Sequence, residues 1–134
     1  MTKQVIIPAG YERKYEVMQF APAIRVGDTV WASGQAGIRA DGSIPDGVEE
    51  QMHLAYKSLK VVLEAAGASL ADVVELVSYH VLMPNDTKEA FAVKKDYFPG
   101  DYPAWTAVGV SALAMPGLLF EVKATAVVGA GKAA

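Results

Sequence analysis

The sequence predicts an α+β fold, in which a mixed sheet of about six strands carries two helices packed on one face. Two segments, residues 46–66 and 86–98, repeat apolar residues at spacings of three and four, as amphipathic helices do. Segments rich in β-forming residues precede, separate and follow these helices. Two helices are too few to cover both faces of such a sheet, so we expect another subunit to cover the second face.

The longer helix has the clearer pattern. Asp46 is expected to cap its start, and Gly67 is expected to end it. In the second helix, Phe91, Phe98 and either Val93 or Lys94 are expected to mark the buried face. The predicted buried positions of the longer helix are Val48, Met52, Ala55, Leu59, Val62 and Leu63.

Alternation of polar and apolar residues predicts the strands. Residues 29–33 (TVWAS) alternate and are rich in β-formers, and in residues 118–128 the polar Glu121, Lys123 and Thr125 alternate with apolar residues. The resulting order is three strands, a helix, a strand, a helix and two strands. The further extended segments are residues 18–24, 73–83 and 104–112.

Length and composition favour one compact domain over residues 1–134. Hydrophobic residues make up 52% of the chain and charged residues 20%, and the net charge is −3. Because Lys and Arg are scattered and outnumbered by Asp and Glu, we expect no nucleic-acid partner. The apolar excess is typical of a chain with a buried subunit interface.

Several classes of site are excluded by what the sequence lacks. The absence of Cys excludes disulfides, thiolate catalysis and Cys-type zinc sites. The two His residues have no acidic residues at ligand spacing, so neither a metal nor another cofactor is expected. No apolar run approaches ~18 residues, so no membrane-spanning helix is expected. The N-terminal residues lack the apolar core of a signal peptide, and a cytoplasmic location is expected.

Four stretches together resemble the Rid family, the YjgF-like reactive-intermediate deaminases. They are VGDTVWASGQAG, QMHLAYKSLKVVLEAAGASLADVVEL, YPAWTAVGV and LLFEVKATAVV. The resemblance runs from about Phe20 to Val128. It implies a chorismate-mutase-like unit that forms homotrimers, and hydrolysis of enamines and imines to ketones and ammonia. It also implies that the small-molecule substrate is bound in clefts between subunits.

Several of the family's site residues are replaced in this sequence. Where deaminating members carry an Arg that grips the substrate carboxylate, this chain has Trp105. An indole offers one N–H and a large apolar face, so it lacks the two-pronged donor of a guanidinium. The family's Tyr corresponds to Phe20, its Asn to Lys95 and its Cys to Ala107.

Two elements of the family site are retained. Gly34 matches the glycine whose backbone approaches the ligand, and Glu121 matches the acidic residue that positions the attacking water. A lone carboxylate in an apolar cleft tends to have a raised pKa and can act as acid or base near neutral pH. The resemblance therefore implies Glu121 as the catalytic residue. The implied substrate-binding residues are Trp105, Phe20, Gly34, Ala107 and Lys95.

Each of these residues also has a purely structural interpretation. Glu121 could be a polar residue on the outward face of its strand, and Trp105 could be core or interface packing. His80 lies in an apolar strand and is expected to be a core or interface histidine. Arg25 or Arg39 could supply a replacement for the family arginine from a neighbouring subunit.

Three functions remain open. The favoured one is a Rid-like hydrolase for an imine, enamine or related small molecule that is not anchored by an α-carboxylate. The alternatives are a non-catalytic small-ligand binder that uses the same clefts, and a structural or regulatory trimer whose cleft is vestigial. Ribonuclease activity is attached to this family by name, but the negative charge and the lack of a basic-aromatic patch disfavour it.

Overall fold

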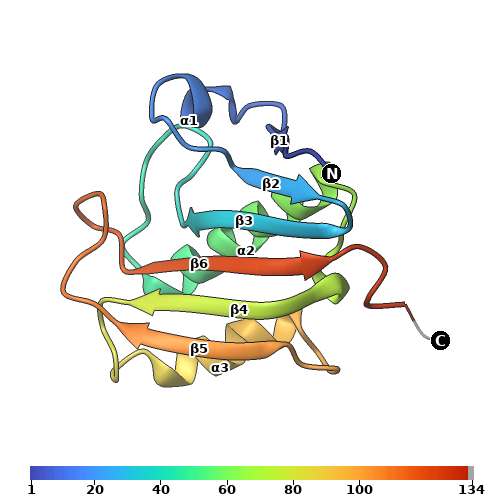
Figure 1. Ribbon diagram of the computed structural model, residues 1–134. Helices are drawn as coiled ribbons and strands as arrows, with labels where there is room; N and C mark the ends of the chain where they lie inside the picture. Colours follow the sequence, from blue (N-terminus) through green and yellow to red (C-terminus); the bar gives the residue numbers. More distant parts are fainter. Residues whose placement is uncertain (133–134) are drawn as a thin grey trace.

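The computed structural model describes residues 1–132, which form a six-stranded sheet with helices on one side (Figure 1). The spatial order of the strands is β1-β2-β3-β6-β4-β5. Strands β4 and β5 run parallel, and all other neighbours run antiparallel. The strands are β1 (Gln4–Ile6), β2 (Ala23–Val26), β3 (Thr29–Ala36), β4 (Val73–His80), β5 (Ala104–Gly109) and β6 (Phe120–Val127). The helices are α1 (Glu12–Glu16), α2 (Val48–Ala65) and α3 (Thr87–Tyr97), with a 3₁₀ turn, η1 (Leu70–Asp72).

The two long helices, α2 and α3, lie behind the sheet in Figure 1, and the front face carries no helix. Strand β6 alternates between these two sides: Phe120 and Val122 are buried, whereas Glu121 and Lys123 are at least partly exposed. The predicted α+β class is therefore confirmed, with a six-stranded mixed sheet and two long helices on one face. The alternation along β6 is also as predicted.

The core lies between α2 and the sheet. Five of the six predicted helix positions are buried, and Val48 is partly buried. Tyr56 of α2 stacks on Tyr97 of α3 with ring centroids 5.0 Å apart, which ties the two helices together. The prediction for α3 was wrong at Phe91, which is 61% exposed. The buried residues of α3 are Ala90, Val93 and Lys94.

Local boundaries differ from the predictions for physical reasons. Helix α1 was not predicted, because none of its five residues is buried and no apolar period marks it. Gly47, not Asp46, is the N-cap of α2, and no side chain caps the helix there. At the other end Gly67 has a φ of 86°, the left-handed conformation that ends helices, as predicted.

Strand β3 extends beyond its predicted end at residue 33. It continues to Ala36 through an irregularity between Ala32 and Gln35, where its register with β6 shifts. An extra residue in one strand bends it and re-aims its side chains, and such bulges are over-represented beside functional sites. Gly34 lies within this bulge.

Leu59 tests the assigned core face of α2. It is fully buried, so Leu59→Ala is expected to lower the free energy of unfolding by about 2–5 kcal/mol through lost burial and a residual cavity. The matched control is Val61→Ala on the same helix, where the side chain is 44% exposed, with an expected change below about 0.5 kcal/mol. Denaturant titrations at one protein concentration measure both, and equal losses would contradict the assignment.

Candidate functional site

The residues predicted for the site form two clusters on opposite faces of the sheet. Glu121 on β6 faces the open side, because its neighbours Phe120 and Val122 point into the core. Trp105 on β5 faces the helices, because its register partner on β4 is the fully buried Leu76. Within one chain these two side chains cannot contact the same small molecule.

On the open face, Glu121 lies against Gly34 and near Lys14. A Cβ atom at Gly34 would collide with the Glu121 carboxylate, so the position of this carboxylate requires glycine there. Lys14 on α1 places its Nζ 5.8 Å from the ring centroid of Phe20 and acts electrostatically on Glu121. Lys14 lies near both Phe20 and Glu121, and Glu121 lies against Gly34, so these three predicted site residues form one cluster. Sequence reasoning missed Lys14 because it lies on α1.

The Glu121 carboxyl has a perturbed protonation equilibrium. Partial burial raises its pKa, and the positive charge of Lys14 offsets part of that rise. Burial lowers the pKa of Lys14, and the charge of Glu121 offsets part of that fall. Among residues 1–132, no group donates a hydrogen bond to this carboxylate. It is therefore available to exchange a proton with water or a ligand.

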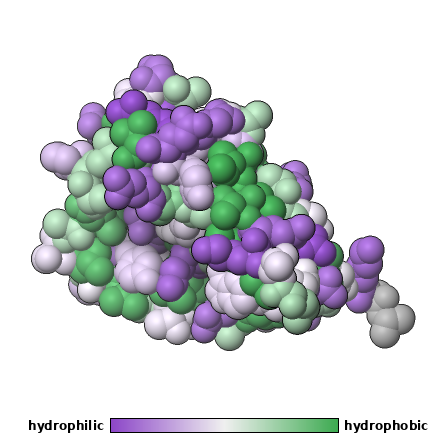
Figure 2. Space-filling model, turned by 45° about the horizontal axis from the view of Figure 1, so that its top comes forward, coloured by the Kyte–Doolittle hydropathy of each residue, from purple (hydrophilic) through white to green (hydrophobic). Residues whose placement is uncertain are grey.

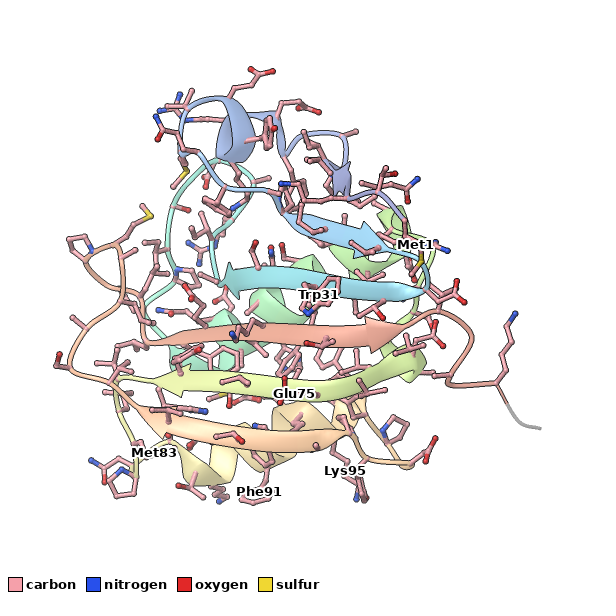
Figure 3. The ribbon with its side chains drawn as sticks, in the orientation of Figure 1. Met1, Trp31, Glu75, Met83, Phe91 and Lys95 are labelled. Atoms are coloured by element: carbon pink, nitrogen blue, oxygen red, sulfur yellow. The ribbon has the colours of Figure 1, made fainter. Side chains whose placement is uncertain are left out.

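On the helix face, Trp105 lines a cavity of about 220 Å³ between β5 and α3. The Trp105 ring meets the Phe91 ring edge to face, with centroids 5.3 Å apart. Figure 3 shows Phe91 and Met83 on the side of α3 and β5, whereas Trp31 and Glu75 lie on the front of the sheet. The lining residues are His80, Met83, Asp86, Thr87, Ala90, Phe91, Trp105 and Ala107.

Ala107 and Lys95 are the other two predicted residues on the side of Trp105, and only Ala107 lines the cavity. Ala107 lines it, two residues after Trp105 and on the same face of β5. Lys95 is exposed on α3 and does not line it (Figure 3). Its neighbour Lys94 contacts Trp105 instead, with Nζ 4.4 Å from the ring centroid, and burial lowers the pKa of Lys94.

A chain of hydrogen bonds runs from Trp105 toward the start of α3. Trp105 Nε1 donates to Ser78 Oγ at 2.9 Å, and Ser78 Oγ lies 2.7 Å from His80 Nε2. His80 Nδ1 lies 2.8 Å from Asp86 Oδ2. Ser78, His80 and Asp86 are each at most 1% exposed.

Sequence reasoning placed His80 among buried residues but did not connect it with Ser78 or Asp86. The spacing of two between Ser78 and His80 in an apolar strand was an available signal, because it puts both on one face. No sequence pattern indicated Asp86, which joins them only because the chain turns back into α3 after β4.

Neither candidate replacement for the family arginine lies at this cavity. Arg25 donates to the backbone carbonyls of Ala66 and Gly27, at 2.8 Å in each case. Arg39 pairs with Glu50 at 3.1 Å and lines a separate groove together with Lys14. Within one chain, no arginine of the described residues takes the place that Trp105 occupies.

The part of the chain that the structure describes offers no metal site. It contains no group of three His, Cys, Asp or Glu side chains placed to hold a metal ion. In the same residues, no helix combines the length and the hydropathy needed to cross a membrane.

A family model described as Endoribonuclease L-PSP matches residues 12–128 of the chain. The RutC family protein YjgH of Escherichia coli (strain K12) is 37% identical over 125 residues, which are 92% of this chain and 94% of that protein. The chain belongs to the YjgF/RutC family. A family member from Dermatophagoides farinae, named 2-iminobutanoate/2-iminopropanoate deaminase, is 33% identical over 96 residues, 70% of this chain and 74% of that one.

Solved structures of the YjgF/RutC family share the whole architecture. Protein YJGH superimposes with a TM-score of 0.86 at 36% identity and covers 96% of this chain and 98% of its own. Rv2704 from Mycobacterium tuberculosis, described as a member of the YjgF/YER057c/UK114 family, has a TM-score of 0.81 at 30% identity. That likeness covers 95% of this chain and 100% of Rv2704. The predicted family resemblance is thereby confirmed.

Glu121→Gln tests the environment of the carboxylate in this YjgF/RutC member. Its pKa is raised in the folded protein, so the folded state binds the proton more tightly, and stability falls as the pH rises through that pKa. The variant is therefore expected to melt at a higher temperature than the parent at about pH 8, with the difference vanishing near pH 4. At about pH 4 the carboxyl is largely protonated in both folded and unfolded states.

Circular dichroism melts across this pH range make the measurement. Glu75→Gln is the matched control, because Glu75 is an exposed carboxylate on the same open face. It should show no comparable pH-dependent gain. A lower melting temperature for Glu121→Gln at about pH 8 would contradict the raised pKa.

Proposed function

We propose that the protein hydrolyses a small imine or enamine to a carbonyl compound and ammonia. Relatives from Dermatophagoides farinae and Mus musculus are named 2-iminobutanoate/2-iminopropanoate deaminases, which supports deamination as the reaction class. One observation carries the proposal for this chain. The Glu121 carboxylate is half-buried, has a raised pKa, lies against Gly34 and accepts no hydrogen bond from residues 1–132.

In the proposed reaction Glu121 relays two protons from oxygen to nitrogen, one after the other. As the water oxygen bonds to the imine carbon, Glu121 accepts a proton from that water and gives it to the nitrogen, which yields the neutral carbinolamine. Glu121 then accepts the hydroxyl proton as the carbonyl forms, and the nitrogen takes that proton as the C–N bond breaks and ammonia leaves. The net change is imine plus water to carbonyl compound plus ammonia. A carboxyl with a raised pKa performs both transfers near neutral pH better than an ordinary glutamate does.

The complete site, in this proposal, lies between two copies of the chain. Glu121 of one copy would face the Trp105 cavity of the next, because one chain presents them on opposite sides. Apolar side chains are exposed on both sides of the sheet: Trp31 is 47% exposed on the open face, and Phe91 is 61% exposed at the α3 edge. Figure 2 shows hydrophobic patches (green) at the surface between hydrophilic regions (purple). Exposed apolar surface of this kind marks subunit interfaces.

The side chain of Trp105 limits the class of substrate that the proposed site can bind. An indole N–H that is already committed to Ser78 cannot grip a substrate carboxylate. We therefore propose a substrate without an α-carboxylate as its anchor, with an apolar or aromatic part that fits beside Trp105 and Phe91. No Lys or Arg of residues 1–132 lines the Trp105 cavity, and a pocket without a cation penalises a carboxylate that it leaves unpaired.

Ribonuclease activity is part of the name of the matched family model, but we do not propose it here. The net charge is −3. Neutralising a phosphate backbone requires clustered Lys and Arg, and binding single-stranded RNA requires aromatic residues among them. The imine-hydrolase proposal needs neither feature. A cytoplasmic location is a prediction from the sequence alone.

A homotrimer is the predicted assembly. Sedimentation equilibrium should give three times the 14.2 kDa mass of one chain over a tenfold range of concentration. Trp31→Glu, which places a charge on the exposed apolar part of the open face, should shift the mass toward that of one chain. Lys60→Glu, an exposed position on α2, is the control and should leave the mass unchanged. A stable monomer for the unaltered chain would contradict the shared site.

Ammonia release from freshly generated imines tests the activity itself. The unaltered protein should turn over neutral or aromatic imines faster than imines with an α-carboxylate. Glu121→Ala should lose roughly 10²–10⁴-fold in rate, the usual contribution of a general acid or base. Lys123→Ala, an exposed neighbour on β6, should keep full activity. No turnover of either imine set would contradict the proposal and leave the two non-catalytic alternatives, a ligand-binding protein and a structural or regulatory trimer.

Mixed assemblies of two inactive variants test whether the site is shared. Glu121→Ala and Trp105→Ala chains, each inactive alone, should recover part of the activity when refolded together. In the mixture, some clefts combine an intact Glu121 with an intact Trp105 from different chains. Failure to recover activity, with both variants assembled, would contradict a site built from two copies.

A further inference from the structure

The hydrogen bonds between Trp105 and Asp86 have one direction. An indole nitrogen can only donate, so Ser78 Oγ is the acceptor of the Trp105 N–H. The hydroxyl proton of Ser78 then has His80 Nε2 as its acceptor, and His80 Nδ1–H donates to Asp86 Oδ2. An imidazolium at His80 would leave the Ser78 hydroxyl proton without an acceptor among residues 1–132. Each N–H and O–H of these bonds therefore has an acceptor when His80 is neutral and Asp86 is ionised.

The negative charge at the end of this chain is incompletely paired. Asp86 is 1% exposed and its Oδ2 is bonded to His80, but its Oδ1 has no hydrogen-bond partner among the described residues. A buried carboxylate oxygen without a donor destabilises the folded protein. Asp86 is the N-cap residue of α3. The helix start does not supply the missing donor, because Asp86 makes no side-chain cap bond.

The cavity beside Asp86 carries no compensating cation. Its lining contains no Lys or Arg, and the nearby Lys94 lies against the Trp105 ring without lining the cavity. The walls are mainly apolar, and two of them are the aromatic rings of Trp105 and Phe91. A cation is attracted to the faces of such rings. The cavity lining therefore includes Asp86, whose buried Oδ1 is unpaired among the described residues, together with two aromatic walls.

We propose that this cavity binds a small organic cation, whose N–H group donates to Asp86 Oδ1 and whose apolar part lies against Trp105 and Phe91. This inference rests on the proposed function. The substrate is then the protonated form of the imine, which is an iminium ion. Protonation makes the imine carbon more electrophilic toward water. Asp86 would hold that proton on nitrogen and would repel a substrate carboxylate. The substrate class becomes a cationic imine with a compact apolar group.

Three ligands of one shape separate charge from packing: benzylammonium, benzyl alcohol and benzoate. Calorimetric titration of the assembled protein near pH 7.5 should give benzylammonium roughly tenfold tighter binding than benzyl alcohol, as one charge-assisted hydrogen bond allows. Benzoate should bind weakest. The indole N–H resonance of Trp105, assigned by its loss in Trp105→Phe, should shift with the cation. Equal binding of benzoate and benzylammonium, or no shift at Trp105, would overturn the proposal.

Variants test the contribution of each wall. Asp86→Asn keeps the size of the side chain and should abolish the preference for the cation while leaving benzyl alcohol binding unchanged. Asp96→Asn is the matched control, an exposed carboxylate on α3, and should keep the preference. If Asp86→Asn does not fold, Phe91→Leu serves instead, because Phe91 is largely exposed. It should weaken the cation several-fold, and an unchanged affinity would count against the proposal.

The same protein samples separate this inference from the proposed function. Binding of the cation at Trp105 without turnover of any imine would keep the cation site and remove the hydrolase. Turnover of imines with no preference for the cation would keep the hydrolase and overturn the cation site.

Discussion

Side chains of a strand alternate between the two faces of its sheet, and in this protein the long helices cover one face only. That constraint decides how every candidate residue can act. Glu121 faces the uncovered side, together with Gly34 and Lys14. Trp105 faces α3 on the covered side. The chain therefore presents the candidate residues in two clusters on opposite faces, and we propose that a second copy of the chain brings the two clusters together.

Trp105, which the family resemblance predicts to stand in the place of an arginine, is coupled to the interior beneath it. A buried indole N–H needs an acceptor, and Ser78 supplies one. Ser78 in turn is held by His80, and His80 by Asp86, so the orientation of the indole depends on a chain of three polar groups. A polar group that is left unpaired in an apolar interior is costly. The one unsatisfied oxygen, on Asp86, is therefore the point of this network that a ligand can complete.

Periodicity was sufficient for the elements that bury a complete face. Helix α2 and strand β6 were predicted because their apolar residues repeat at 3.6 and 2, the periods of helix and strand. Periodicity did not predict α1, because no residue of α1 is buried. The sequence also placed Phe91 wrongly, because its apolar side chain suggested a core position. On α3, Ala90 and Val93 face the core instead, so Phe91 lies at the edge beside Trp105. A residue's hydropathy does not distinguish the core from a cavity wall.

The sequence by itself determined the fold class, the two long helices, the family and the chemical character of single residues. These properties follow from local periodicity and from motifs read along the chain. Only the tertiary structure decided which residues meet. Lys14 reaches Glu121 from an unpredicted helix, and Asp86 reaches His80 because the chain turns back into α3 after β4. Contacts of this kind depend on how elements are placed in space, and no local pattern in the sequence encodes a distance between two elements.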